Sequence, residues 1–194
     1  MAITITTDPI VGLSDVKELI SEASDKEATL LINAVSEKFL RYTHRRRITQ
    51  GSITEWAMGG LDKIYLHGCP VDEDSEITVS VYGSDGDVTT TMTLTDGDLR
   101  VVQSPVDAYI ELLTYTPPWV EGVDTVKVAY TGGWETVPGD IVLAAIDQMR
   151  VERQRRGGTL GAVSVSANGE TVKFETSGLI RSVQDAFDPY RMVI

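Results

Sequence analysis

The spacing of apolar residues changes twice along this chain, and that change limits the possible folds most strongly. Over residues 24–43, and again over 138–156, apolar residues recur every three or four positions, as on the buried face of a helix. Between about residues 50 and 130 they alternate with polar residues in short runs, as on half-buried strands. The pattern predicts an α+β fold, in which helices from both ends pack together as a small bundle, an antiparallel β subdomain is inserted between them in the chain, and a hairpin and tail follow at the C-terminus.

The clearest helix signal begins at Ser24. Glu27 stands three residues further on, which is the spacing of a capping box. An apolar stripe follows through four turns, made of Ala28, Leu31, Ile32, Val35, Phe39 and Tyr42. A shorter helix is predicted over 14–23. We expect the long helix to run into residues 45–47, three arginines whose charge suits the negative end of a helix dipole.

Short strands are predicted in the middle of the chain, separated by turns rich in Gly and Asp. They cover residues 77–82, 88–94, 99–103, 108–115 and 123–130. Pro117-Pro118 breaks the last pair. This arrangement indicates an antiparallel sheet or a small barrel.

A third long helix is predicted to start at Pro138 and to stop at Gly157-Gly158. Asn168-Gly169 then joins two short strands, since this dipeptide is the strongest short hairpin signal in a sequence. A last amphipathic turn covers residues 179–187. The chain is thus expected to be a single domain of 194 residues, with a helical scaffold (1–48 and 131–187) and a β-rich subdomain (49–130).

The negative charge is concentrated in the middle. Residues 51–140 hold three basic and sixteen acidic side chains, a net charge of −13. The whole chain has a net charge of −12, so the rest of the chain is close to neutral. Such a surface repels nucleic acid, which argues against a DNA-binding module. No apolar run approaches the roughly 20 residues of a membrane span, and residues 1–7 lack the features of a signal peptide.

Candidate catalytic and metal-binding groups are weak. Cys69 is the only cysteine, so we expect a reduced thiol, and His67 near it lacks an orienting third group. The acids of residues 72–76 lack calcium-loop spacing and are interpreted as a solvated turn. Gly132-Gly133 lacks the lysine and the spacing of a phosphate loop. We therefore predict no catalytic residue, metal or cofactor.

The arginines leave two interpretations open. One group is residues 45–47 and the other comprises Arg150, Arg153, Arg155 and Arg156. They can serve as solvated helix ends, or they can meet acidic surfaces of another copy of the chain, since guanidinium groups suit planar contacts to carboxylates. For the second interpretation we single out Arg45, Arg46, Arg153, Arg155 and Arg156.

Several separated motifs, taken in order, resemble the head–tail connector (adaptor) proteins of tailed bacteriophages. Tyr42-Thr43-His44-Arg45 matches a Tyr-Thr-x-Arg signature, in which glycine is more usual than His44. Pro70-Val71, Tyr130 to Trp134 and the Val137-Pro138 helix follow in the same order, and Pro189-Tyr190-Arg191 closes the chain. The match covers roughly 14–48, 64–82 and 125–192, whereas 83–124 match nothing in the family and read as an enlarged β insertion.

The resemblance implies a structural virion protein of the particle neck, assembled in the host cytoplasm. Its copies form a ring, commonly of twelve, that joins the portal to stopper or tail-completion proteins and lets genomic DNA pass without binding it. The last residues, 188–194, are implied to be a docking tail that reaches the portal. By position, Phe187, Pro189, Tyr190 and Arg191 are then the predicted portal contacts, since aromatic and arginine side chains anchor interfaces.

Two other functions remain open. The chain could be an accessory binding module of a virion, whose β subdomain recognises a tail partner or a carbohydrate. It could also be an acidic hydrolase, although no nucleophile, base or metal cluster stands out.

Overall fold

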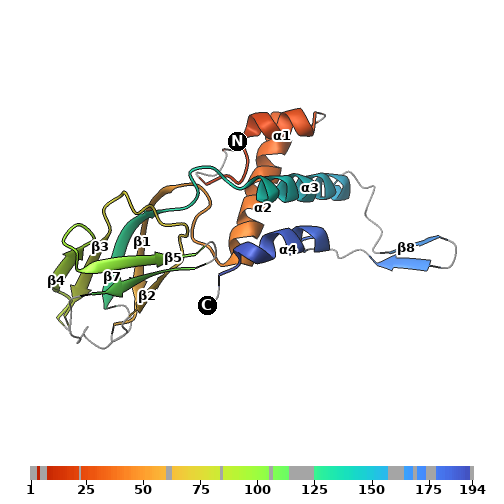
Figure 1. Cartoon of the computed structure of the whole chain (residues 1–194). Coiled ribbons are helices and arrows are strands. Elements are labelled where there is room, and N and C mark those ends of the chain that lie inside the picture. The colour runs from red at the N-terminus through yellow and green to blue at the C-terminus, as the bar shows by residue number, and fades with distance from the viewer. Residues whose placement is uncertain are drawn as a thin grey trace. The chain divides into compact units, whose positions relative to one another are not determined.

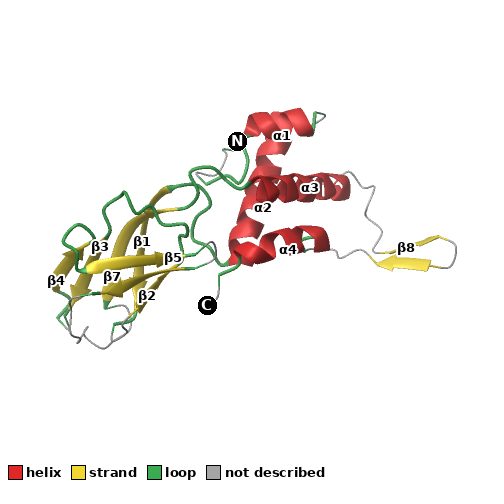
Figure 2. Ribbon diagram, in the orientation of Figure 1, coloured by secondary structure: helices red, strands yellow, loops and turns green. Residues whose placement is uncertain are grey.

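The computed structural model describes residues 4, 8–21, 23–59, 63–83, 85–104, 107–113, 125–156, 164–167, 170–173 and 178–192. The chain divides into two compact units. We call Met1–Thr43 with Val137–Pro189 the helical unit, and His44–Thr136 with Tyr190–Ile194 the β unit. The chain passes from one unit to the other after residues 43, 136 and 189. The boundaries predicted from the sequence were after residues 48, 130 and 187. Figure 2 shows the helices in red and the strands in yellow.

The helical unit contains α1 (Leu13–Leu19), α2 (Asp25–Thr43), α3 (Gly139–Arg156) and α4 (Arg181–Phe187), labelled in Figure 1. The predicted cap at the start of α2 is present, with the Glu27 amide donating to Ser24 Oγ over 3.3 Å. The buried faces of α2, α3 and α4 supply the core: Ala28, Leu31, Ile32, Val35, Phe39, Ile141, Ala145, Ile146, Met149, Val183 and Phe187. The helical period thus located the core of this unit.

α2 ends at Thr43, before the three arginines. His44 takes a left-handed φ of 59°, a conformation that glycine adopts at helix ends without strain. This explains why glycine is the more usual residue in the Tyr-Thr-x-Arg motif. The prediction that residues 45–47 complete the helix is therefore wrong, because the chain has already turned away and Arg45 belongs to the β unit.

The β unit has two antiparallel sheets. The first runs in the order β1-β7-β3-β4 and the second in the order β2-β6-β5. Their strands are β1 (Gly51–Ala57), β2 (Lys63–Leu66), β3 (Thr78–Tyr82), β4 (Val88–Thr93), β5 (Leu99–Gln103), β6 (Ala108–Leu112) and β7 (Val126–Gly132). Among the described strands, neither sheet closes into a barrel, so the α+β prediction is confirmed with two open sheets.

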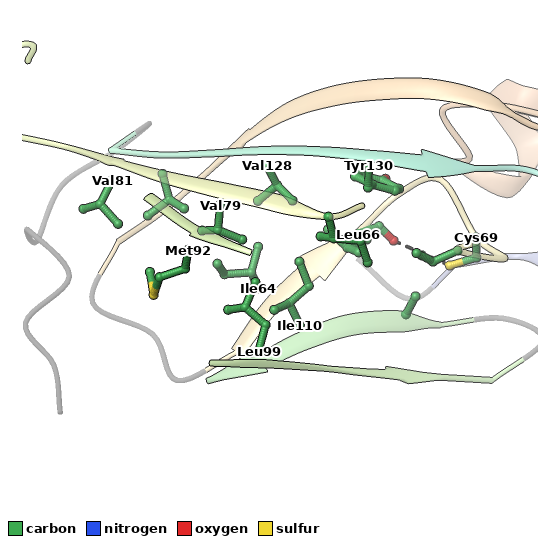
Figure 3. Close-up of a cluster of buried hydrophobic side chains, with 14 of the residues drawn as sticks. Ile64, Leu66, Cys69, Val79, Val81, Met92, Leu99, Ile110, Val128 and Tyr130 are labelled. Atoms are coloured by element: carbon green, nitrogen blue, oxygen red, sulfur yellow. Dashed lines mark hydrogen bonds between the residues drawn. The ribbon is translucent and has the colours of Figure 1, made fainter. Parts of the chain in front are cut away.

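The inward faces of the two sheets form one hydrophobic core (Figure 3). Burial alternates along β7, where Val126, Val128 and Tyr130 point inward, as expected of a strand with one buried face. The same core contains Ile64, Leu66, Val79, Val81, Met92, Leu99 and Ile110, together with Cys69 and Met192. Met192 lies far from the others in sequence, so the C-terminal segment takes part in folding the β unit.

A separate two-stranded sheet pairs β8 (Ser164–Ala167) with β9 (Glu170–Lys173), as the hairpin signal predicted. The predicted turn at Asn168-Gly169, the glycines 157–158 and the prolines 117–118 lie outside the described residues. A 3₁₀ turn, η1 (Asp188–Tyr190), follows α4. None of the helices in the described ranges is both long and apolar enough to span a membrane.

Candidate functional site

Arg45 is the centre of the most elaborate polar cluster in the described β unit. It follows α2 by two residues and is only 4% exposed. A buried guanidinium is strongly destabilising unless its donors find acceptors. The contacts that satisfy Arg45 come from the other motifs that the sequence singled out, at residues 69–71, 130–134 and 189–191.

Three kinds of contact hold the Arg45 side chain. Its Nε donates to the carbonyl oxygen of Tyr190 over 2.8 Å, and its Nη1 donates to the carbonyl oxygen of Cys69. The guanidinium also lies over the indole of Trp134, 4.4 Å from the ring centroid. Burial lowers the pKa of Arg45, but arginine remains charged in proteins, so each contact is charge-assisted.

The loop over residues 67–71 that offers the Cys69 carbonyl is itself fixed by backbone hydrogen bonds. The Arg46 amide donates to the His67 carbonyl over 2.8 Å. The Gly133 amide donates to the carbonyls of Gly68 and Pro70, over 3.1 and 2.9 Å. Gly132 permits this approach, since a Cβ there would lie 2.0 Å from the Gly68 oxygen. The glycine pair after β7 is therefore needed for close backbone packing.

Glu55 secures the same loop from inside the sheet. This carboxylate is 6% exposed, and its Oε1 accepts from Tyr130 Oη at 2.5 Å and from the His67 amide at 3.0 Å. Its Oε2 lies 3.0 Å from His67 Nδ1, and Tyr130 Oη accepts from the Gly68 amide. Burial alone raises the pKa of Glu55, but these hydrogen bonds outweigh it and hold the pKa below its ordinary value.

Glu55 was missed in the sequence, although a signal for it exists. It occupies the inward position of β1 between Ile53 and Ala57, where an apolar residue is expected. An acid in such a position requires hydrogen-bond donors, which Tyr130 and His67 provide. The pKa of Tyr130 is raised, mainly by burial and secondly by the nearby Glu55 carboxylate. Its hydroxyl therefore stays protonated and donates.

Cys69 is buried, and its surroundings do not suit a nucleophile. Burial raises the pKa of its thiol to about 11, so the thiol is protonated at neutral pH. The sulfur donates to the Leu66 carbonyl over 3.6 Å, and His67 is engaged with Glu55 (Figure 3 labels Leu66 and Cys69). Both residues follow the end of β2, so strand geometry does not direct their side chains to one side.

The clustered acids serve as turn formers. Asp72 Oδ1 accepts from the Asp74 amide over 3.1 Å, and Asp85 Oδ1 accepts from the Asp87 amide over 3.2 Å. Such side-chain to backbone bonds are typical of Asx turns. Within the described residues, no group of three or more His, Cys, Asp or Glu side chains is placed to hold a metal ion. The interpretation of residues 72–76 as a turn is confirmed.

The four predicted portal contacts have different surroundings. Phe187 is fully buried in the helical unit, its ring centroid 4.8 Å from that of Phe39. Pro189 and Arg191 are exposed, and Tyr190 is half-buried with its ring centroid 5.7 Å from that of Trp134. Met192 is 5% exposed. The segment is therefore not a free tail beyond the core, as the sequence suggested, because alternate residues are anchored. Its docking role stays a prediction.

The arginines predicted to face another copy of the chain also make contacts within their own unit. Arg153 Nε lies 3.2 Å from Glu27 Oε1, and Arg155 Nη1 lies 3.6 Å from Glu152 Oε1. Arg46 is exposed, whereas Arg45 is buried in the cluster described above. Arg156 is the last residue of α3, and its side chain lies outside the described part of the structure.

A second buried polar group, in the helical unit, was also missed. Gln148 on α3 is fully buried, and its Oε1 accepts from the Ile180 amide at the start of α4 over 3.0 Å. Its Nε2 donates to Glu152 Oε1 over 2.9 Å, and Lys38 on α2 reaches the same oxygen at 2.5 Å. Gln148 and Glu152 thus connect three helices through polar contacts that apolar periodicity does not reveal.

Comparison with known proteins gives matches only among solved structures. No protein-family model matches the chain, and no curated protein sequence matches it. A chain in the virion of a native gene transfer agent (GTA) particle is similar with a TM-score of 0.63 at 16% identity, covering 98% of this chain and 94% of that one. Chains in the neck of an empty GTA particle, computed with C6 symmetry, and of a native one, computed with C12 symmetry, have TM-scores of 0.57 and 0.56 at 16% and 17% identity.

The two neck matches cover 100% of this chain and 97% of each matched chain. At this identity the likeness establishes the fold: from end to end, this chain has the fold of chains found in the neck of a phage-like particle. The finding agrees with the connector resemblance, which rests on sequence motifs alone.

Proposed function

We propose that this protein is a structural component of a virion neck, a head–tail connector and not an enzyme. The observation that supports it most is the fold likeness to GTA neck chains over the full length of the protein. The motifs of the connector resemblance add independent support, because Arg45, Trp134 and Tyr190 contact one another in the β unit.

The connector assembles as a homo-oligomeric ring between the portal and the stopper or tail-completion proteins. The neck structures that resemble this chain were computed with sixfold and twelvefold symmetry, which supports a ring, and we propose a dodecamer. Genomic DNA passes through its lumen without specific binding. The net charge of −13 over residues 51–140 suits this role, since attraction to phosphates would slow the passage of DNA.

The exposed part of the C-terminal segment contacts the portal. Pro189 and Arg191 are exposed and Tyr190 is half-buried, so these three can reach another protein. Phe187 is buried in the core of the helical unit, where it packs against Phe39. An exposed arginine beside an aromatic side chain is the composition expected of an interface anchor.

Contacts between ring subunits involve arginines of both units. Arg46 is exposed, and Arg153 and Arg155 are partly exposed although each already has an acidic neighbour. Replacing Arg153, Arg155 and Arg156 together by glutamine weakens ring formation in a salt-dependent manner if they also meet carboxylates of a second copy. If the variant assembles like the original protein at every ionic strength, these arginines make contacts only within their own unit and not with a second copy.

A second candidate function is an accessory binding module of the virion. It is favoured by two aromatic pairs on the β unit, each with one exposed member. The rings of Trp56 and Tyr82 are 5.0 Å apart, and those of Tyr65 and Tyr109 are 5.8 Å apart. Trp56 is 49% and Tyr65 is 55% exposed, and exposed aromatic side chains often serve to bind proteins or sugars.

Native mass spectrometry and negative-stain imaging of the purified protein, alone and co-expressed with the portal protein of the same particle, separate the two candidates. A closed ring, or a ring formed on the portal, supports the connector. A monomer that never joins the portal contradicts it, and binding to a glycan array would then support the accessory module.

A further inference from the structure

We infer that Arg45 positions the C-terminal segment, so that the exposed residues beside it are displayed at a fixed place. The inference rests on the proposed portal docking by this segment and names the residue on which that docking depends. The sequence places Arg45 in the Tyr-Thr-x-Arg motif, but it does not indicate that Arg45, and not Arg46 or Arg47, contacts the C-terminal segment.

The first step is the direction of the contacts. The Arg45 Nε–H donates to the carbonyl oxygen of Tyr190, a backbone group of the segment itself, over 2.8 Å. Its Nη1–H donates in another direction, to the carbonyl oxygen of Cys69. The planar fork of a guanidinium serves both acceptors at once, whereas the single ammonium of a lysine is a point charge on a flexible stem.

The second step is the rigidity of what Arg45 is fastened to. The loop over residues 67–71 is held by Glu55 through the His67 amide, by Tyr130 through the Gly68 amide and by the Gly133 amide. All these contacts lie within the β unit and are largely buried. Arg45 therefore connects the segment to an element that has little freedom to move.

The third step is the pattern of burial along the segment. The Tyr190 ring meets the Trp134 ring nearly at right angles, at 83°, and the Arg45 guanidinium lies over the Trp134 ring. Met192 is buried in the β core, whereas Arg191 between them is exposed. Because Tyr190 and Met192 are both held in place, the position of the exposed Arg191 between them is fixed.

Arg45 therefore acts as a positioning residue for Arg191 and is not itself the contact. Arg45 is only 4% exposed, and a side chain so enclosed in its own unit is poorly accessible to a second protein. This supports a positioning role for Arg45 and a contact role for Arg191. The prediction that Arg45 faces a neighbouring subunit is replaced by this one in our proposal.

Trypsin provides a direct test, since it cleaves after Arg191 only when the segment leaves the β unit, and this removes residues 192–194. Intact-mass spectrometry follows that loss over time for the full-length protein and for Arg45→Lys. We expect Arg45→Lys to accelerate the loss about ten- to a hundredfold, the factor that one lost charge-assisted hydrogen bond implies. Arg46→Lys, a substitution of the exposed neighbour, should leave the rate unchanged.

The pattern of cleavage separates positioning from a general loss of stability. If Arg45 positions the segment, cleavage at the other Lys and Arg sites keeps its original rate. An equal acceleration at all sites, or no acceleration after Arg191, overturns the inference. Should Arg45→Lys fail to fold, Tyr190→Ala removes the ring contact with Trp134 while Arg45 stays, and it should release the same three residues faster.

The proposed docking is tested separately by Arg191→Glu in co-expression with the portal protein. Loss of the complex in Arg191→Glu, together with a weaker complex in Arg45→Lys, is the expected result. If Arg191→Glu still binds the portal, the docking proposal fails, while the trypsin result continues to decide whether Arg45 holds the segment.

Discussion

The two units of this protein use polar groups in different ways. In the helical unit the buried polar side chains among the described residues, such as Gln148, are neutral, and most of the ion pairs lie at its surface, such as Arg153 with Glu27, whose side chains are 27% and 33% exposed. In the β unit a charged arginine and a carboxylate are both buried, Arg45 at 4% and Glu55 at 6% exposure. They fasten a loop and the C-terminal segment to the sheets.

This difference indicates which kind of contact determines the arrangement of the backbone in each unit. Apolar packing tolerates small rearrangements, so it stabilises a helical bundle without fixing each backbone group. A buried and hydrogen-bonded charge has few permitted arrangements, because any displacement leaves a donor or acceptor unsatisfied. The polar cluster therefore fixes the one region of the β unit in which we propose that docking residues are displayed.

The largest expected effect is in the helical unit. Phe187→Ala removes a fully buried ring that packs edge-on against Phe39, and it should lower the free energy of unfolding by about 3–5 kcal/mol. Hydrogen exchange measured by mass spectrometry should accelerate in α2, α3 and α4 and not in β3 and β7. Arg181→Ala, at an exposed position of α4, is the control. Equal acceleration in the strands would show that the two units unfold as one.

The next effect is in the β unit. Glu55→Gln keeps the shape of the side chain but places an amide where one carboxylate accepts from Tyr130 and His67. We expect a loss of about 1–3 kcal/mol of stability, seen in chemical denaturation. Glu135→Gln, at an exposed position, should change little. A neutral result for Glu55→Gln would mean that the buried polar cluster contributes no more than a surface pair.

Titration of Glu55 sharpens the same comparison. Its pKa is lower in the folded protein than the ordinary value of 4.5, so the ionised form is favoured by folding. The stability it contributes is complete above pH 4.5 and is lost as the pH falls through the folded pKa. The difference in stability between the original protein and Glu55→Gln should therefore shrink below pH 4.5. A difference that does not depend on pH would assign the effect to shape and not to charge.

The smallest effect is expected at the surface of the helical unit. Arg153→Gln removes a pair with Glu27 that is partly open to solvent, and it should lower stability by less than about 1 kcal/mol. Thermal unfolding at low and high salt is the measurement, and the difference should fall as salt rises. A loss as large as that of Glu55→Gln would remove the distinction between the two units.

The sequence predicted those parts of the fold that depend on apolar period. The core face of α2, its cap at Ser24, strand β5 and the pairing of β8 with β9 follow from spacing and turn residues. The end of α2 was misplaced, because His44 stands in a left-handed position that usually takes glycine. Strand β1 was not delimited, since Glu55 interrupts its apolar face.

The candidate site was only partly predictable. The motifs that hold Arg45, Trp134 and Tyr190 were identified separately, but no local pattern indicates that they touch. The C-terminal residues were interpreted as a tail because they follow the last predicted helical turn and because of the connector resemblance. Met192 nevertheless joins the β core. Contacts between distant parts of a chain depend on the folded topology, which local patterns do not encode.

The measurement that tests this account most directly is hydrogen exchange of the protein truncated after Pro189. We predict faster exchange in β3 and β7, because the truncation removes Met192 from the core and the Tyr190 carbonyl from Arg45, with a loss of about 2 kcal/mol or more. Exchange in α2 and α3 should be unchanged. If the strands keep their full protection, the C-terminal segment is a free tail, and the proposed role of Arg45 is contradicted.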